Sequence, residues 1–144
     1  QQALAIRQLD EMAGLQALLT VYSATEDEAA IKKLFAGLTP EQQQNPELLF
    51  MQGLYSQSSK QYDLATEQFK QAISFSGSED AYKATKFGAL YQIGRTSVLS
   101  KQNITAGIKA LEEYMQTAPK LGGLPSKEWA AFRLANLQAE SGNQ

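Results

Sequence analysis

A short motif returns along this chain at a fixed interval. Its small residues, Gly53, Gly94 and Ala135, follow one another at intervals of 41 residues. Each is preceded by an apolar residue four positions earlier and an aromatic residue three positions earlier: Leu49 and Phe50, Leu90 and Tyr91, Ala131 and Phe132. Repeats of about 20–50 residues are typical of chains built from stacked helical units, so this interval constrains the fold strongly.

A second motif follows each of the first two small residues. It combines a small residue, a large residue four positions later and a further core residue three positions after that: Ala65, Phe69 and Ala72, then Gly107, Leu111 and Tyr114. These spacings place the three side chains on one face of a helix. The two motifs together predict pairs of antiparallel helices that pack closely as hairpins, each stacked on the next hairpin.

Apolar residues recur at three- or four-residue spacing along most of the chain, and no stretch alternates with period two for long enough to predict a strand. Thr25 to Glu28 match a capping box, Asn45 is a good N-cap before Pro46, and Ser126 caps the last helix. A polar turn is expected to begin at Thr39. The expected helices cover residues 3–23, the segment from the capping box to Leu38, and residues 46–58, 61–75, 79–101, 104–117 and 126–141.

Composition excludes several classes of function. The chain has 144 residues and a net charge of −2 with scattered Lys and Arg, so it lacks the basic footprint of a nucleic-acid-binding protein. No apolar run approaches the about 20 residues of a membrane span. Cysteine and histidine are absent, which excludes disulfides, zinc sites built on thiolates or imidazoles, and catalytic triads with histidine. Cysteine-free chains occur in both the cytoplasm and the periplasm, so the compartment stays open.

Acidic clusters at residues 26–28 and 79–80 lie at expected helix starts, where they complement the helix dipole. A third cluster, at residues 112–113, lies inside an expected helix. Clustered carboxylates could serve a metal or acid–base site, but the position of the first two clusters favours a role in helix formation. We therefore predict no enzymatic activity, no metal and no cofactor.

The repeated motifs resemble the tetratricopeptide repeat, whose signature is Leu-Gly, an aromatic residue, Ala-x3-Phe and a closing Pro. Residues 46–77 carry the best copy: Leu49, Gly53, Tyr62, Ala65, Phe69 and Ala72. The next copy contributes Leu90, Ile93, Gly94, Gly107, Leu111, Tyr114 and Pro119. The resemblance implies an all-α, right-handed superhelix of about seven antiparallel helices, in one domain over 1–144 that is part of a longer chain. Its repeats would span roughly residues 12–45, 46–86, 87–125 and 128–144, the first degenerate and the last truncated.

In this family the first helix of each hairpin lines a concave groove. The corresponding positions lie three residues before and one residue after each small residue: Phe50, Leu54, Tyr91, Arg95, Phe132 and Asn136. Trp129 lies on the same side of the last helix, one turn before Phe132. Aromatic and Arg side chains suit recognition because they offer contact area and fixed donors. The other interpretation is that the three repeated aromatics only pack between helices. The family's clamp for a C-terminal carboxylate uses Lys, Arg and Asn; only Arg95 and Asn136 fit, so the clamp is not carried over.

The resemblance implies a protein-interaction scaffold whose groove binds an extended peptide or a helix of apolar character. The alternative is a self-association or regulatory module of a longer protein, and a weaker third possibility is a small-molecule pocket between the aromatics. The last expected helix also carries apolar residues around more than half of its surface, including Trp129, Phe132, Leu134 and Leu137. We therefore predict a homodimer through residues 126–141, unless a following helix covers this stripe.

Overall fold

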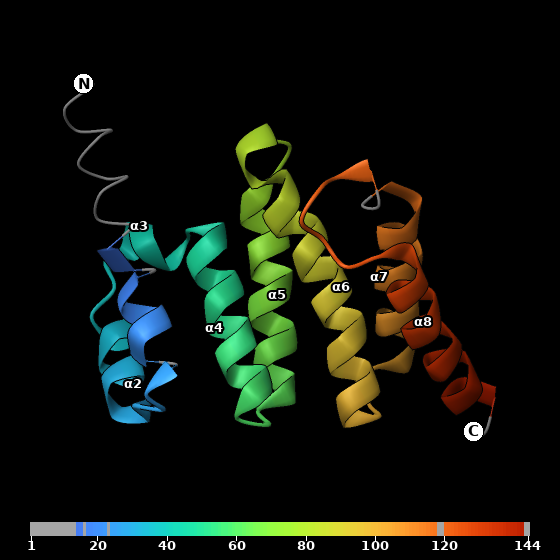
Figure 1. Cartoon of the computed structure of the whole chain (residues 1–144), viewed down its shortest axis with the longest axis horizontal. Helices are drawn as coiled ribbons and strands as arrows, with labels where there is room; N and C mark the ends of the chain where they lie inside the picture. Colours follow the sequence, from blue (N-terminus) through green and yellow to red (C-terminus); the bar gives the residue numbers. More distant parts are fainter. Residues whose placement is uncertain (1–13, 16, 23, 118–119, 143–144) are drawn as a thin grey trace. The chain divides into compact units, whose positions relative to one another are not determined.

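The computed structural model describes residues 14–15, 17–22, 24–117 and 120–142, and these residues form helices joined by turns (Figure 1). The described part contains no strand, which confirms the all-α prediction. The chain divides into two units, residues 1–42 and 43–144, which are described separately. The helices are α2 (Glu28–Ala36), α3 (Pro40–Gln43), α4 (Pro46–Ser58), α5 (Tyr62–Ser76), α6 (Lys83–Ser100), α7 (Ile104–Thr117) and α8 (Lys127–Gly142).

Helix boundaries in the second unit follow the predicted ones closely. The Asn45 side chain caps α4 by accepting hydrogen bonds from the backbone N–H groups of Glu47 and Leu48, at 3.0 and 3.1 Å. The Ser126 hydroxyl caps α8 by accepting from the Trp129 N–H, at 3.3 Å. One correction applies to the helix expected over 79–101. It begins as a 3₁₀ turn, η1 (Asp80–Tyr82), and only then continues as α6, a common form of helix N-terminus.

Two corrections apply to the caps in the first unit. The Thr25 hydroxyl donates to the backbone carbonyls of Val21 and Tyr22, at the end of the preceding helix. The cap of α2 is instead Asp27, whose carboxylate accepts from the Ala30 N–H at 3.1 Å. Glu26 takes a φ of +54°, a turn conformation that breaks the helical register a Thr25 capping box would need.

The expected polar turn after Thr39 contains the short helix α3. Thr39 and Gln42 form the reciprocal capping box: the Thr39 N–H donates to Gln42 Oε1 at 2.9 Å, and the Gln42 N–H donates to Thr39 Oγ1 at 3.2 Å. Pro40 occupies the first helical position, where its missing N–H costs nothing. Of the helix expected over 3–23, residues 14, 15 and 17–22 are helical, and residues 3–13 lie outside the described part.

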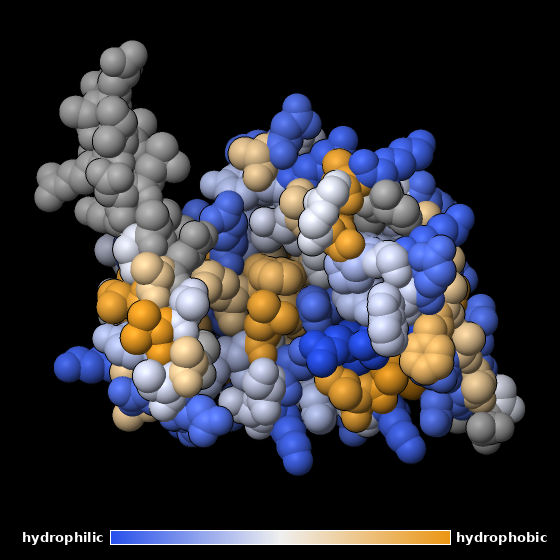
Figure 2. All heavy atoms as spheres, viewed as in Figure 1, coloured by the Kyte–Doolittle hydropathy of each residue, from blue (hydrophilic) through white to orange (hydrophobic). Residues whose placement is uncertain are grey.

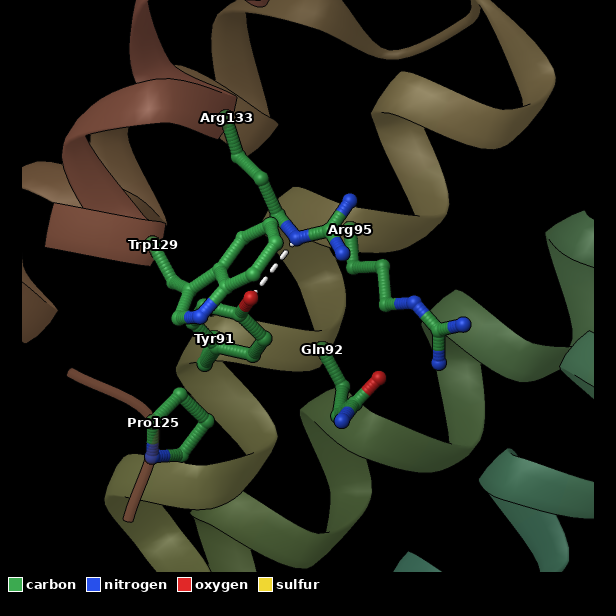
Figure 3. Close-up of a pocket in the computed structure, with 6 residues that line it drawn as sticks. All are labelled: Tyr91, Gln92, Arg95, Pro125, Trp129 and Arg133. Carbon is green, nitrogen blue, oxygen red and sulfur yellow. Dashed lines mark hydrogen bonds between the residues drawn. The ribbon is translucent and has the colours of Figure 1, made fainter.

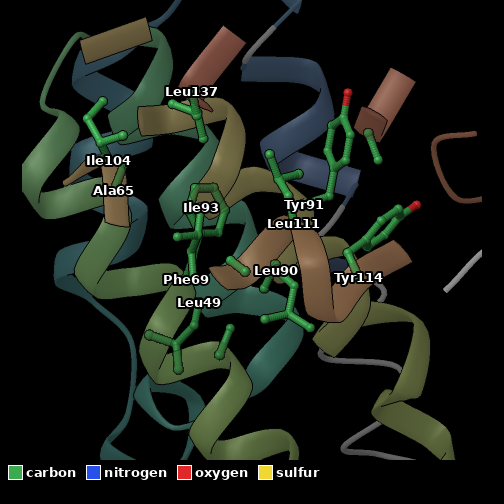
Figure 4. Close-up of a cluster of buried hydrophobic side chains, with 14 residues drawn as sticks. Leu49, Ala65, Phe69, Leu90, Tyr91, Ile93, Ile104, Leu111, Tyr114 and Leu137 are labelled. Atoms are coloured by element: carbon green, nitrogen blue, oxygen red, sulfur yellow. The ribbon is translucent and has the colours of Figure 1, made fainter. Parts of the chain in front are cut away.

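Each helix of the second unit packs against the next one along the chain, from α4 to α8. The buried hydrophobic side chains of these helices form one cluster (Figure 4). At two places a glycine of one helix faces a large residue of the next. A Cβ added at Gly53 would lie 2.5 Å from Phe69 Cε1, and one added at Gly94 would clash with the side chain of Leu111. Phe69 and Leu111 are completely buried, as the two predicted motifs require.

The third copy of the motif behaves differently. Ala135 on α8 is exposed, whereas Gly53 and Gly94 are buried. The side of α8 that packs inward carries Ala130 and Leu137, which are 0% and 1% exposed. Leu137 lies over Gly107 of α7, where an added Cβ would come within 2.9 Å of Leu137 Cδ1. Helix α8 therefore packs against α7 through the side that carries Leu137, and the side that carries Ala135 is exposed to solvent.

Candidate functional site

A cavity of about 280 Å³ lies between α6 and α8 in the second unit (Figure 3). Helix α6 contributes Tyr91, Gln92 and Arg95 to the lining. Helix α8 contributes Trp129 and Arg133, which lie four residues apart, and Pro125 comes from the segment before α8. Residues four apart on a helix share a face, which is why each helix presents its side chains to the same space.

Three of the seven predicted groove residues meet at this cavity: Tyr91, Arg95 and Trp129. Phe50 and Leu54 lie on α4, half-buried against the hydrophobic core, and the Phe50 ring centroid is 5.7 Å from that of Phe69. These two residues therefore contribute to packing as well as to surface.

The remaining two predicted groove residues lie on α8 outside the lining of the cavity. Asn136 is half-buried. Phe132 is 57% exposed and packs edge-on against Trp129, with 6.1 Å between ring centroids. The interpretation that the aromatics only pack between helices does not describe Phe132, because more than half of its side chain is open.

Arg133 belongs to the cavity, although the repeat frame did not single it out. Its Nε donates a hydrogen bond to the Tyr91 hydroxyl at 2.7 Å, and its guanidinium carbon lies 5.6 Å from the centre of the Tyr91 ring. This combines a hydrogen bond with a cation–π contact on one aromatic side chain. Arg133 and Gln92 were detectable in the sequence, because both lie two residues before a small residue of the repeated motif and are themselves 41 residues apart.

A buried polar network holds the opposite side of the cavity. Arg95 Nη1 donates to Gln57 Oε1 of α4 at 3.0 Å. Gln57 is 5% exposed, and its Nε2 donates to Gln92 Oε1 at 3.1 Å and to Thr96 Oγ1 at 3.0 Å. Buried amides are stable only when their hydrogen-bonding groups are satisfied, and this one bonds through both its oxygen and its nitrogen. The network fixes the Arg95 side chain relative to α4.

The charges at the cavity are of one sign. Its described lining residues include two guanidinium groups, Arg95 and Arg133, and no carboxylate. Figure 2 shows a strongly hydrophilic patch over α6 and α8, bordered by hydrophobic side chains. The arrangement offers cationic hydrogen-bond donors beside aromatic surface. In the part of the chain that the structure describes, no three His, Cys, Asp or Glu side chains gather as a metal site.

Tyr114 of α7 packs against Tyr91, one of the residues that line the cavity. It is completely buried, its ring centroid is 5.4 Å from that of Tyr91, and its hydroxyl donates to the Pro125 carbonyl at 2.6 Å. This bond ties the segment before α8 to α7 and so places Pro125 at the cavity. Burial raises the pKa of the Tyr114 hydroxyl above its usual value, and the neighbouring Tyr91 raises it further.

The raised pKa of Tyr114 predicts a loss of stability at alkaline pH. Because the unfolded protein releases this proton from about pH 10, before the folded protein does, the contribution of Tyr114 is complete below about pH 10 and falls as pH rises towards the folded-state pKa. We expect wild type to exceed Tyr114→Phe in free energy of unfolding by about 1 kcal/mol near neutral pH. Urea unfolding of both proteins between about pH 8 and 11 should show this advantage shrinking; a constant advantage would contradict the assignment.

The first unit has a separate, mostly apolar groove of about 490 Å³. It is lined by residues from the helix before α2, from α2, from the segment after α2 and from α3: Leu15, Tyr22, Ala30, Lys33, Leu34, Gly37, Leu38 and Gln42. Its single cation, among the described lining residues, is Lys33.

Comparison of the chain with protein-family models, with curated proteins and with solved structures finds no match. Among the helices of the described residues, none combines the length and the apolar character needed to cross a membrane.

Proposed function

We propose that this protein is a protein-interaction module that binds an extended peptide or a helix along α4, α6 and α8. The observation that carries the proposal is the cavity between α6 and α8, where the 57%-exposed Trp129 lies beside Tyr91 and two Arg side chains. Trp and Arg are among the residues most enriched at the energetic centres of protein interfaces. Tyr91 is only 5% exposed, and its hydroxyl holds Arg133 by accepting the hydrogen bond from Nε. A half-open cavity with such a lining suits a side chain of a partner.

The proposal includes a tetratricopeptide-like arrangement of the helices. Its support is the order of contacts in the second unit, where α4 packs on α5 and α6 packs on α7, while α6 also contacts both α4 and α8. Hairpins whose first helices are neighbours are the building principle of helical-repeat scaffolds. In that arrangement α4, α6 and α8 would be the first helices of successive repeats and would form one continuous binding face.

The first test compares two exposed aromatic residues of α8. Trp129 lines the cavity and Phe132 does not, although both are 57% exposed. After a peptide array has identified ligands with aromatic or apolar residues, we expect Trp129→Ala to weaken binding by roughly 1–3 kcal/mol and Phe132→Ala to change it little. Titration calorimetry measures both affinities. Equal losses in the two variants, or no loss in either, would count against the cavity as the binding site.

A second candidate function is self-association through α8, and the exposure of Trp129 and Phe132 together favours it. Leu137 cannot test this candidate, because it is 1% exposed and its replacement would disturb the fold. Phe132→Glu is the suitable variant, since it places a charge on the open face. Light scattering over a concentration series should then show a dimer in wild type and a monomer in the variant; a wild-type monomer at all concentrations would exclude the second candidate.

A further inference from the structure

We propose that residues 120–126, which lead into α8, are an internal competitor of the bound peptide. This segment is called the strap below. Its Leu124 side chain occupies the surface between Phe50 of α4 and Gly88 of α6, where a partner must place an apolar side chain of its own. The inference rests on the proposed function and adds a regulatory step to it: the partner binds fully only after the strap has been displaced.

Gly88 leaves a space on α6 that its repeat equivalent fills on α8. Gly88 lies 41 residues before Trp129, so the two residues hold the same position relative to the repeated small residue. Where α8 presents an indole ring, α6 presents no side chain. Gly88 is nevertheless buried, which means that side chains from other parts of the chain cover it. The question is which residues take this place.

Leu124 of the strap is one of the side chains that cover Gly88. A Cβ added at Gly88 would lie 3.8 Å from Leu124 Cδ2 and 3.4 Å from Phe50 Cε2, so both side chains reach this point. Leu124 and Phe50 are half-buried and pack against the hydrophobic core. Figure 1 shows the chain crossing over α6 just before it enters α8. Because Phe50 is a predicted groove residue, a peptide side chain that packs on it at Gly88 would compete with Leu124 for the same space.

The strap is built to open without unfolding the helices. Lys120, Gly122 and Gly123 are exposed, and a Cβ added at either glycine would meet no atom within 4 Å. Its far end is fastened by the hydrogen bond of 2.6 Å from the Tyr114 hydroxyl to the Pro125 carbonyl. Exposed segments that bury little apolar surface open at a lower free energy than the core does. Release of the strap therefore requires the loss of the Leu124 contact and of this hydrogen bond, while α6, α7 and α8 stay packed.

The strap also indicates the chemistry of the partner. Leu124 fills the space at Gly88, and the next residue, Pro125, lies at the cavity beside Trp129. A peptide in which Leu precedes Pro can make both contacts in the same order. The strap competes at a high effective concentration because it belongs to the same chain. The apparent dissociation constant of the partner is the intrinsic one divided by the fraction of molecules with an open strap.

The experiment uses the full chain and a synthetic copy of the strap, acetyl-Lys-Leu-Gly-Gly-Leu-Pro-Ser amide. We expect Leu124→Ala to bind this peptide about tenfold more tightly than wild type does, because a strap that is closed in about nine of ten molecules weakens binding by that factor. Amide chemical shifts in NMR titrations measure the affinity and should place the contact at Gly88. Ile108→Ala is the matched control: it removes the same number of carbon atoms from a half-buried residue of α7 that packs against the core, and it should bind the peptide as wild type does.

Two further measurements assign the effect to the strap. Tyr114→Phe removes the hydrogen bond to the Pro125 carbonyl and leaves Leu124 in place, so it should tighten binding of the peptide by a smaller factor, about threefold. A peptide that carries Leu124→Ala should bind the Leu124→Ala protein about tenfold more weakly than the unchanged peptide, because it lacks the apolar side chain that fills the vacated space. Circular dichroism and thermal unfolding verify that each variant is folded.

The outcomes separate this inference from the proposed function. Equal affinity of wild type and Leu124→Ala for the strap peptide, or no binding by either, would overturn the inference, because Leu124 would then only fill the core. Weaker binding by Leu124→Ala would also overturn it, since the strap would then be part of the binding surface. In both cases array ligands that depend on Trp129 would leave the proposed function standing. An array without ligands for wild type and for Leu124→Ala would instead overturn the proposed function.

Discussion

Replacing Gly94 with Leu is expected to destabilise the protein by about 2–3 kcal/mol, because it overpacks the contact between α6 and α7. Even a methyl group at Gly94 would clash with the side chain of Leu111, which is completely buried. Densely packed interiors transmit such a collision to the backbone and separate the two helices. Urea unfolding followed by circular dichroism measures the difference in free energy between variant and wild type.

Gly88 provides the control in the same helix. A Cβ at this position would lie 3.4 Å from Phe50 Cε2, an ordinary van der Waals contact. Because alanine is a better helix former than glycine, Gly88→Ala should stabilise the protein by about 0.5–1 kcal/mol. Opposite signs at the two glycines would identify close packing against Leu111 as the reason for Gly94. A tolerated Gly94→Leu would show that α6 and α7 do not meet there.

The contacts between paired helices were predictable because they depend on local spacing. The small residues of α4 and α6 and the large residues of α5 and α7 lie at intervals that only a helix brings onto one face. Each large residue follows its glycine by 16 or 17 residues, which suits a close antiparallel hairpin: Gly53 with Phe69, and Gly94 with Leu111. The two motifs therefore contained the residues on both sides of these contacts, and the structure shows which of them face each other.

The helix N-caps were harder to predict, because two segments within fifteen residues of one another match the same capping-box pattern. Thr25-x-x-Glu28 and Thr39-x-x-Gln42 both match a capping box, and only the second forms one. Pro40, directly after Thr39, fixes the backbone in a conformation suited to the first turn of a helix. In the other segment Asp27, itself a favourable N-cap residue, caps α2 in place of Thr25. Which cap forms depends on the path of the chain through the preceding turn.

Part of the candidate site was predictable and part was not. The repeat frame identified Tyr91, Arg95 and Trp129, whereas Phe132, which it also assigned to the groove, lies outside the lining of the cavity. Phe50 and Tyr91, the equivalents of Phe132 in the repeat, each pack against an aromatic ring of the following helix, Phe69 and Tyr114 respectively. Among the described residues, Phe132 has no such ring from a following helix. Arg133 shares a repeat position with Gln92, but that position does not by itself reveal the hydrogen bond to Tyr91 on another helix, which brings Arg133 to the cavity.

The orientation of α8 leads to the second large expected effect: Leu137→Ala should destabilise the protein by about 2–5 kcal/mol, the usual range for truncating a buried leucine. Leu137 is 1% exposed and lies against Gly107, where the missing side chain allows α7 and α8 to approach closely. Loss of this contact weakens the attachment of the helix that carries Trp129 and Arg133, so the tryptophan fluorescence of the variant should respond to urea at lower concentration.

Phe132→Ala is the matched substitution on the same helix. It removes a larger side chain, yet we expect a change within about 0.5 kcal/mol, because Phe132 is 57% exposed. The two positions are five residues apart, which at about 100° per residue places them on well-separated faces of α8. If the smaller truncation is the more damaging one, α8 packs through Ala130 and Leu137 and presents Phe132 to its surroundings. A larger loss in Phe132→Ala would mean that α8 is rotated about its axis, which would also remove Trp129 and Arg133 from the cavity and with them the basis for its proposed ligand.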